Sequence, residues 1–142
     1  MAILTPQNEA EVRKALGALR DPVKLTVFSQ SLAAAELCAQ NEQLVREVAA
    51  LSDKITMEVL NLAIDRERAA SYGIDRVPAI VVEGARDYGI RFYGVPLGYE
   101  FGNLIDAIIV ASTGEPALAE ATKTALAGLD RDVDIKVFST PT

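Results

Sequence analysis

The sequence predicts an α/β protein with a mixed four-stranded sheet flanked by helices, plus the first helix and strand of a second unit. Two observations support this prediction. Segments with helical periodicity alternate with short segments in which every second side chain is apolar. In addition, residues 14–30 (KALGALRDPVKLTVFSQ) recur as residues 124–140 (TALAGLDRDVDIKVFST), with seven identical positions at a spacing of 110 residues. That spacing fits one small domain, so we expect a first domain over 1–114 and the start of a second over 115–142.

The first predicted helix begins at Asn8, where acidic residues suit the positive end of the helix dipole, and runs to about Leu19. Pro22 ends it, because the residue before a proline is driven out of helical geometry. Alternating apolar residues then predict a strand over Val23–Ser29. The remaining predicted elements are a helix over Ala33–Leu51, a strand over Ile55–Leu62, a helix over Asp65–Tyr72, strands over Val77–Val82 and Tyr88–Tyr93, helices over Tyr99–Ser112 and Ala117–Leu129, and a strand over Val133–Phe138.

The connections between these elements predict how the strands pair. A helix joins the first two strands, so they should be parallel with a right-handed crossover. A short turn joins the third and fourth strands, so they should form an antiparallel hairpin. The expected result is a mixed sheet with helices on both faces.

The composition excludes several classes of function. The chain has 142 residues, a net charge of −6, no histidine and one cysteine. Without histidine it cannot contain a Ser-His-Asp or Cys-His nucleophile or a histidine-based zinc site, and we predict neither metal nor cofactor. One cysteine excludes an intrachain disulfide. The acidic balance and the lack of aromatic platforms argue against nucleic acid as a partner.

Neither a secretory signal nor a membrane segment is expected. The first residues, MAILTPQNEAE, have no basic region and no long apolar core. The most apolar run, Leu104–Ala111, has eight residues and contains Asp106, so it is too short to cross a bilayer. We therefore expect a cytoplasmic protein.

Two segments are candidates for chemistry. Ligands usually sit in the loop after a parallel strand, here residues 29–38, which includes Cys38. Cys38 lies about a turn and a half inside the predicted helix, so we interpret it as an ordinary buried cysteine. Ser29 and Ser31 are interpreted as loop or capping hydroxyls, because no base is near them in sequence. In the second segment, a cis Val77–Pro78 bond would leave the backbone of Val77 open to an extended ligand, although trans is the commoner state.

Three stretches resemble a known family: VKLTVFSQ, RVPAIVVEG and, most specifically, DYGIRFYGVPLGYEFGNLI. They look like the amino-terminal half of the glutaredoxin-like protein disulfide oxidoreductases, in which two thioredoxin-type units are fused. They also resemble the amino-terminal tandem unit of the flavoprotein subunit of bacterial alkyl hydroperoxide reductase. The resemblance extends from about Glu9 to Thr142, and it implies a thioredoxin-like fold.

The resemblance also implies roles for four residues. Pro78 matches the family's cis-proline, and Val77 the residue whose backbone meets the bound substrate. Cys38 falls near the second, resolving cysteine of the family's Cys-x-x-Cys motif, and Ala35 on the first, attacking one; this alignment needs one inserted residue between Ser31 and Ala35. The family's partners are protein thiols and disulfides, or a donor resembling thioredoxin reductase.

One departure from the family decides the predicted function. Thiol–disulfide exchange needs an attacking thiolate and a second thiol that resolves the mixed disulfide, and this chain has only Cys38. We therefore predict a redox-silent half that serves as scaffold and docking unit. The chain would be a fragment, and the active cysteine pair would follow Thr142 in a second unit.

Two alternatives remain open at this stage. The first is a monothiol redox protein in which Cys38 forms a mixed disulfide with glutathione or a partner. The second is a non-enzymatic interaction module. In that case the trailing strand Val133–Phe138 would pair with another chain, so self-association is expected.

Overall fold

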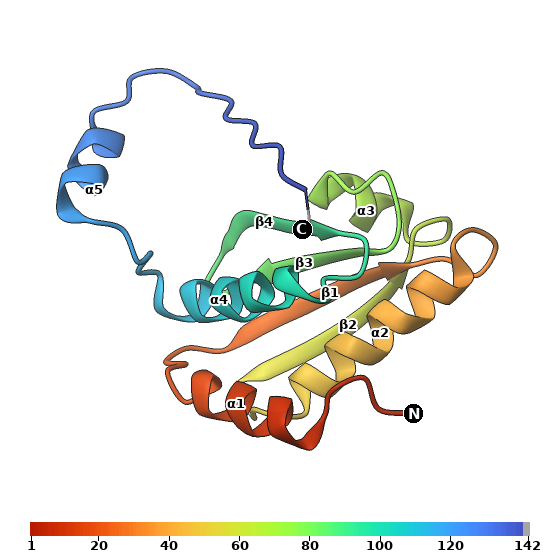
Figure 1. The fold of residues 1–142 in the computed structure, drawn as a ribbon. Helices are drawn as coiled ribbons and strands as arrows, with labels where there is room; N and C mark the ends of the chain where they lie inside the picture. The colour runs from red at the N-terminus through yellow and green to blue at the C-terminus, as the bar shows by residue number, and fades with distance from the viewer. Residues whose placement is uncertain (141–142) are drawn as a thin grey trace.

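The computed structural model describes residues 1–140; Pro141 and Thr142, the last two residues of the predicted second unit, lie outside the described residues. The helices and strands follow one another in the predicted order up to residue 127 (Figure 1). They are α1 (Pro6–Leu16), β1 (Val23–Ser29), α2 (Ala35–Ala49), β2 (Ile55–Asn61), α3 (Arg66–Tyr72), β3 (Ala79–Glu83), β4 (Asp87–Tyr93), α4 (Tyr99–Thr113) and α5 (Glu120–Ala127).

The four strands form one mixed sheet in the order β2-β1-β3-β4. β1 and β2 are parallel, with Val23 opposite Ile55 and Ser29 opposite Asn61. β3 is antiparallel to both β1 and β4, and it pairs Ala79 with Phe28 of β1. The predicted mixed sheet and its antiparallel hairpin are therefore confirmed.

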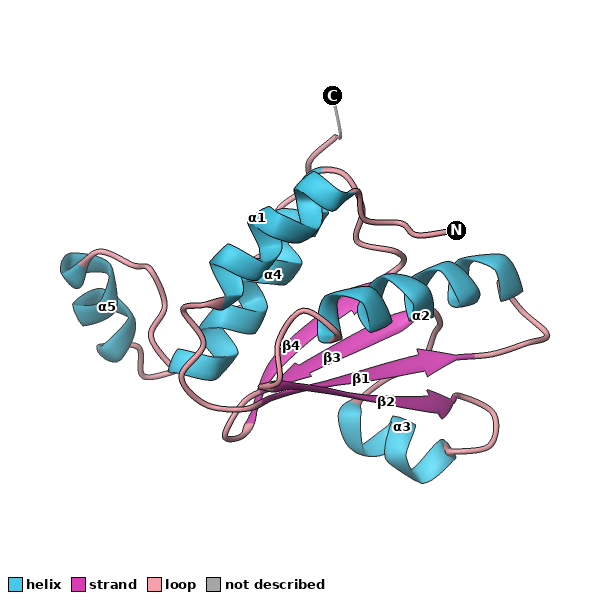
Figure 2. Cartoon of the chain, turned by 90° about the horizontal axis from the view of Figure 1, so that it is seen from below, coloured by secondary structure: helices cyan, strands magenta, loops and turns pink. Residues whose placement is uncertain are grey.

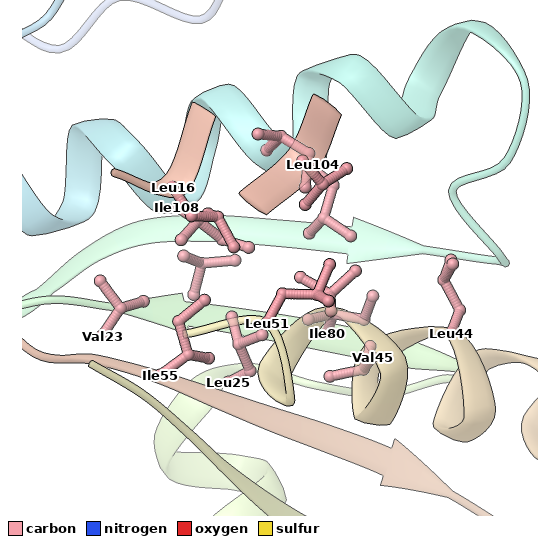
Figure 3. Close-up of a cluster of buried hydrophobic side chains, with 14 of the residues drawn as sticks. Leu16, Val23, Leu25, Leu44, Val45, Leu51, Ile55, Ile80, Leu104 and Ile108 are labelled. Atoms are coloured by element: carbon pink, nitrogen blue, oxygen red, sulfur yellow. The ribbon is translucent and has the colours of Figure 1, made fainter. Parts of the chain in front are cut away.

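Helices cover the two faces of the sheet unequally. α1, α2 and α4 lie on one face and α3 lies on the other (Figure 2). Alternate residues of β1 separate the two layers, since Leu25 and Val27 point to the three-helix face and Phe28 points to the α3 face. The larger core therefore forms on the three-helix side, where burying each Leu or Ile side chain contributes about 1.5–3 kcal/mol. Figure 3 shows this core, including Leu16, Val23, Leu25, Leu44, Val45, Leu51, Ile55, Ile80, Leu104 and Ile108.

On the α3 face, a small apolar cluster around Phe28 is continued by charged and aromatic groups. Tyr72 of α3 packs edge-on against Phe28 and donates a hydrogen bond to the carboxylate of Glu83 at 2.8 Å. The guanidinium of Arg91 lies 5.5 Å from the centre of the Tyr72 ring and donates to both carboxylate oxygens of Asp87. These contacts link α3 to β3 and β4 on this face of the sheet.

The first helix differs from the prediction at both ends. Thr5, not Asn8, is its N-cap: the Thr5 hydroxyl accepts a hydrogen bond from the Asn8 amide, and Pro6 occupies the first helical turn. The helix ends at Leu16, because Gly17 closes it before the chain reaches Pro22. The predicted Asn8 cap was therefore wrong by one helical turn.

A glycine allows the closest contact between the sheet and α4. A β-carbon on Gly84, in the turn between β3 and β4, would overlap the backbone carbonyl of Ala111 near the end of α4. Ser112 secures the same end of α4: its hydroxyl accepts from the amides of Arg20 and Asp21 and donates to the Asp21 carbonyl at 2.7 Å. These contacts fix α4 against the sheet and the loop that leads into β1.

The predicted strand Val133–Phe138 is not formed. Within the described residues, those from 128 onward belong to no helix or strand, and their apolar side chains are exposed, up to 91% for Phe138. The sequence pattern is strand-like, but a strand needs a neighbour to satisfy its backbone groups, and this segment lies beside none. The preceding helix α5 forms, but it is shorter than the predicted Ala117–Leu129.

None of the helices in residues 1–140 combines the length and the apolar character that a bilayer crossing requires.

Candidate functional site

The predicted site residues gather at one end of the sheet. β1 and β2 both end there, at Ser29 and Asn61, and β3 begins there because it runs antiparallel to β1. The loop after β1 and the start of α2 lie at this end, beside the loop that joins β2 to α3 (Figures 1 and 2). The amide of Leu62 donates to the carbonyl of Ser29 at 3.0 Å and ties the two loops together.

The loop after β1 leads into α2 through an unusual backbone turn. Ala34 has φ 53° and ψ 36°, the left-handed conformation, and in residues 1–140 no other non-glycine residue has a positive φ. Alanine in this region costs of order 1 kcal/mol. Consequently α2 begins at Ala35, two residues later than predicted, without a side-chain cap. Ala35 itself is exposed.

Cys38 lies one turn into α2 and points inward. Its side chain is 1% exposed, and its amide donates to the Ala34 carbonyl at 2.8 Å. The thiol has one weak polar contact, with the carbonyl of Ala33 at 3.9 Å. A thiol in such a place packs as a small apolar side chain, and reactive cysteines by contrast are partly exposed beside positive charge. The position that the resemblance assigns to the attacking thiol is therefore open but carries a methyl group.

Val77 and Pro78 lie at the same end of the sheet, on the β3 side. The Val77–Pro78 peptide bond is cis. Pro78 is buried, and its carbonyl accepts from the Gly94 amide at 2.9 Å, whereas Val77 is half-buried. Within residues 1–140 neither the amide nor the carbonyl of Val77 takes part in a backbone hydrogen bond.

A hollow of about 470 Å³ opens on the β2 side of β1, whereas Val77 and Pro78 lie on its β3 side. We call it the β2-side hollow. It is lined by Ser29, Gln30, Ser31, Ala35, Cys38, Ala39, Glu42, Val59, Leu60, Asn61 and Asp65. Val77 and Pro78 are not part of its wall. The structure therefore brings Ala35 and Cys38 together in one depression and leaves the Val77 backbone as a separate feature.

Hydrogen bonds from basic side chains lower the pKa values of two carboxylates on the α3 face of the sheet, and the Arg76 guanidinium lowers the pKa of its neighbour Asp75 next to Val77. Hydrogen bonds from Arg68 and Lys24 lower the pKa of Glu58, and the Arg91 guanidinium lowers the pKa of Asp87. Glu58 lies 2.6 Å from the Lys24 ammonium and 2.9 Å from Arg68, so these groups form a structural ion-pair network.

Sequence reasoning missed two features of this region. The first is the β2-side hollow. Its wall combines residues from the loop after β1 with residues from the loop after β2, so no short stretch of sequence predicts it. The second is Asn41, which is fully buried on α2 one turn after Cys38; neither side-chain atom has a hydrogen-bond partner within residues 1–140. The helical spacing of Cys38, Asn41 and Val45 could have placed Asn41 on the buried face.

The fold and the site together define a class. This chain has a thioredoxin fold. The fold is recognised by the strand order β2-β1-β3-β4 with one parallel pair, by the helix α2 that follows β1 in the chain, and by the cis-proline immediately before β3.

Comparison with solved structures identifies the kind of thioredoxin-fold unit. The chain is similar to the NTD_N/C domain of alkylhydroperoxide reductase AhpF from Enterococcus faecalis, with a TM-score of 0.80 and 23% identity over 90% of this chain and 62% of that one. It is also similar to a protein disulfide oxidoreductase from Aeropyrum pernix, with a TM-score of 0.76 and 26% identity over 91% of this chain and 56% of that one.

Sequence comparisons add two relatives, of which the second is named as a thioredoxin. The chain is 32% identical over 114 residues to a protein named NADH dehydrogenase from Ferdinandcohnia aciditolerans. It is 43% identical over 44 residues to a probable thioredoxin from Methanothermobacter thermautotrophicus, a match that covers 31% of this chain and 47% of that protein. No family model matches the chain.

The resemblance inferred from the sequence is therefore confirmed at the level of the unit: the chain is a thioredoxin-fold unit similar to those of an alkylhydroperoxide reductase AhpF and of a protein disulfide oxidoreductase. The match to the Ferdinandcohnia protein includes 80% of this chain but only 19% of that protein. The match to a Bacillus subtilis protein of the same name includes 12% of that protein.

Proposed function

We propose that this chain is the redox-silent half of a protein disulfide oxidoreductase, a scaffold and docking unit for thiol–disulfide exchange that a second unit performs. The observation that carries the proposal is the pair of positions at the start of α2. Ala35, at the exposed position, has no sulfur, and Cys38 is buried. A disulfide relay needs a thiolate that can attack and a second thiol that releases the product.

Two observations support a second unit that carries the active pair after residue 142. Residues 124–140 repeat the helix and strand that begin the folded domain. The similar chains from Enterococcus and Aeropyrum are longer, since this chain spans 62% and 56% of them. The extended segment Val133–Phe138 would then become a strand of that second unit, where neighbouring strands would satisfy its backbone.

The docking role rests on the free backbone of Val77. An extended segment of a protein substrate, or of a donor that resembles thioredoxin reductase, would pair with its amide and carbonyl. The names of the relatives, an NADH dehydrogenase and an alkylhydroperoxide reductase subunit, fit a chain of electron transfer that starts from a reduced nicotinamide. A cytoplasmic location belongs to this proposal.

The proposal is tested by reading the coding region downstream of residue 142 and by weighing the native protein by mass spectrometry. We expect a Cys-x-x-Cys motif within about ten codons and a native mass well above 15.2 kDa. A native product that ends at Thr142 would refute the second unit. A longer product without a cysteine pair would refute the relay.

The exposed trailing segment favours a second candidate, a non-enzymatic interaction module that self-associates. Val133, Ile135 and Val137 alternate with charged Asp134 and Lys136 and are all exposed. Because such a segment pairs readily with another edge, we expect concentration-dependent dimers in sedimentation of the 142-residue chain. Charged substitutions at Ile135 and Val137 should abolish them. A clean monomer at high concentration would exclude this module.

A monothiol function has less support. An acceptor of glutathione must expose its sulfur, and Cys38 is 1% exposed.

A further inference from the structure

We propose that the β2-side hollow is a docking site for a lysine or arginine side chain of a partner polypeptide, flanked in the partner by apolar residues. This site would add to the proposed function a contact that does not involve Val77. The two surfaces lie on opposite sides of β1, since Val77 and Pro78 take no part in the wall of the hollow.

The charges of the hollow select a cation. Its wall contains two charged residues, Glu42 and Asp65, and both are carboxylates. One oxygen of Asp65 accepts from the Asn61 amide at 2.7 Å, and Glu42 takes part in no hydrogen bond or ion pair within residues 1–140. The carboxylate of Glu42 and the second oxygen of Asp65 therefore remain available to an incoming ammonium or guanidinium.

A side-chain cation fits the hollow better than a metal ion does. Across the described part of the chain, no three His, Cys, Asp or Glu side chains converge on one point, as a bound metal would require. The wall also contains apolar groups, Val59, Leu60 and Ala39, alongside the carboxylates. Lysine and arginine combine an apolar stem with a charged head, so they match both parts of this wall.

Two exposed apolar residues that are next in sequence to wall residues, here called the apolar rim, favour a polypeptide as the occupant. Leu32, which follows the wall residue Ser31, is 92% exposed, and Ile64, which precedes Asp65, is 80% exposed. Large aliphatic side chains so exposed are typical of interaction surfaces. They would contact the apolar neighbours of the partner's cation. The net charge of −6 would also steer a basic segment toward this chain.

The test uses two acetylated pentapeptides, Gly-Leu-Lys-Leu-Gly and Gly-Leu-Gln-Leu-Gly, titrated into the ¹⁵N-labelled 142-residue chain. We expect the lysine peptide to shift the amide signals of Gln30, Glu42 and Asp65 and to bind about fivefold more tightly than the glutamine peptide, as one accessible ion pair provides. Glu42→Gln should reduce this difference, because only the second oxygen of Asp65 would remain for the lysine. Glu36→Gln, on the same helix but outside the hollow, should leave it unchanged.

A second variant tests the apolar rim. Leu32→Ser should weaken both peptides by the same factor, because the rim contacts the leucines that they share. Equal binding of the two peptides, an equal effect of the Glu36 and Glu42 substitutions, or the absence of binding at millimolar peptide would overturn the proposal. Shifts confined to Val77 and Gly94 would also overturn it, and they would leave the docking edge of the proposed function intact.

Discussion

Ala35 and Cys38 lie one helical turn apart at the start of α2, with the first exposed and the second buried against the sheet. We propose that these are the two positions of a Cys-x-x-Cys pair from which the attacking sulfur is missing. The backbone positions would suit a pair of thiols, but only one of the two side chains contains sulfur. A single buried thiol cannot perform thiol–disulfide exchange.

Restoring the missing sulfur tests this relationship. In Ala35→Cys the two thiols would lie at positions i and i+3, one turn apart on the same side of α2, where a modest local adjustment lets them close a disulfide. We expect the variant to lose both free thiols on mild oxidation, measured by thiol titration and mass. Gln40→Cys is the control, because its side chain leaves α2 in another direction. Two free thiols in oxidised Ala35→Cys would show that the site does not have the geometry of a dithiol pair.

The burial of Cys38 predicts slow alkylation. In the native chain we expect iodoacetamide to label this thiol at least about a hundredfold more slowly than in urea, because the sulfur must first be exposed by unfolding. Labelling is followed by mass spectrometry at neutral pH. Rapid modification of the folded chain would instead favour the monothiol alternative.

Features of the fold that depend on neighbouring residues could be predicted from the sequence, and features that depend on distant residues could not. β1 was predicted residue for residue, because the alternation of Val23, Leu25 and Val27 and the proline before it are local signals. The start of α2 was misplaced. Ala33, Ala34 and Ala35 all favour a helix, but the loop turns through a left-handed Ala34 that propensity does not reveal.

The errors at longer range have another cause. Val133–Phe138 has the pattern of a strand, but pairing is a tertiary event and the segment lies beside no other strand. The β2-side hollow could not be predicted either, because it depends on how close two loops from different parts of the chain approach each other. The roles of Val77 and Pro78 were inferred from the proline before the strand and from the resemblance, and they stay predictions.

Gly84 should tolerate no larger side chain. In Gly84→Ala the new methyl group would overlap the Ala111 carbonyl, and α4 would have to move away from the sheet. We expect a loss of about 2–3 kcal/mol in the free energy of unfolding, measured with urea. Gly102→Ala is the matched control. Gly102 is exposed within α4, and a β-carbon added there would have no atom within 4 Å. Because alanine favours a helix more than glycine does, the free energy of unfolding of the control should rise by about 0.5–1 kcal/mol. Equal stability of the two variants would contradict this close packing.

Replacing Asn41 by leucine should stabilise the fold. The amide of Asn41 is buried without a partner among residues 1–140, and a buried unpaired polar group costs about 1–3 kcal/mol. Asn41→Leu removes that cost with a side chain of the same branched shape and the same number of heavy atoms, so urea denaturation should show a gain of about 1 kcal/mol. Gln40→Leu, on the exposed side of the same helix, should change stability by less than about 0.5 kcal/mol. A loss of stability in Asn41→Leu would mean that this amide makes a bond that stabilises the native state.

The pair formed by Asp87 and Arg91 predicts a pH dependence. Hydrogen bonds from Arg91 lower the pKa of Asp87, so the carboxylate stabilises the fold above its unfolded pKa, and this contribution is lost as the pH falls through the folded pKa. Asp87→Asn should therefore cost about 1 kcal/mol at neutral pH and nothing in strong acid. Unfolding measured between pH 7 and pH 2, with the exposed Asp53→Asn as control, checks this. A cost that does not depend on pH would indicate lost packing rather than lost charge.

The most direct measurement of the central claim is the reduction of insulin disulfides by the purified 142-residue chain in the presence of dithiothreitol. A thioredoxin-fold unit with a buried lone cysteine cannot cycle, so the rate should equal that of dithiothreitol alone, and it should stay there when Cys38 is replaced by alanine. A rate that rises in proportion to the chain, and falls back in Cys38→Ala, would contradict the claim that this unit is redox-silent.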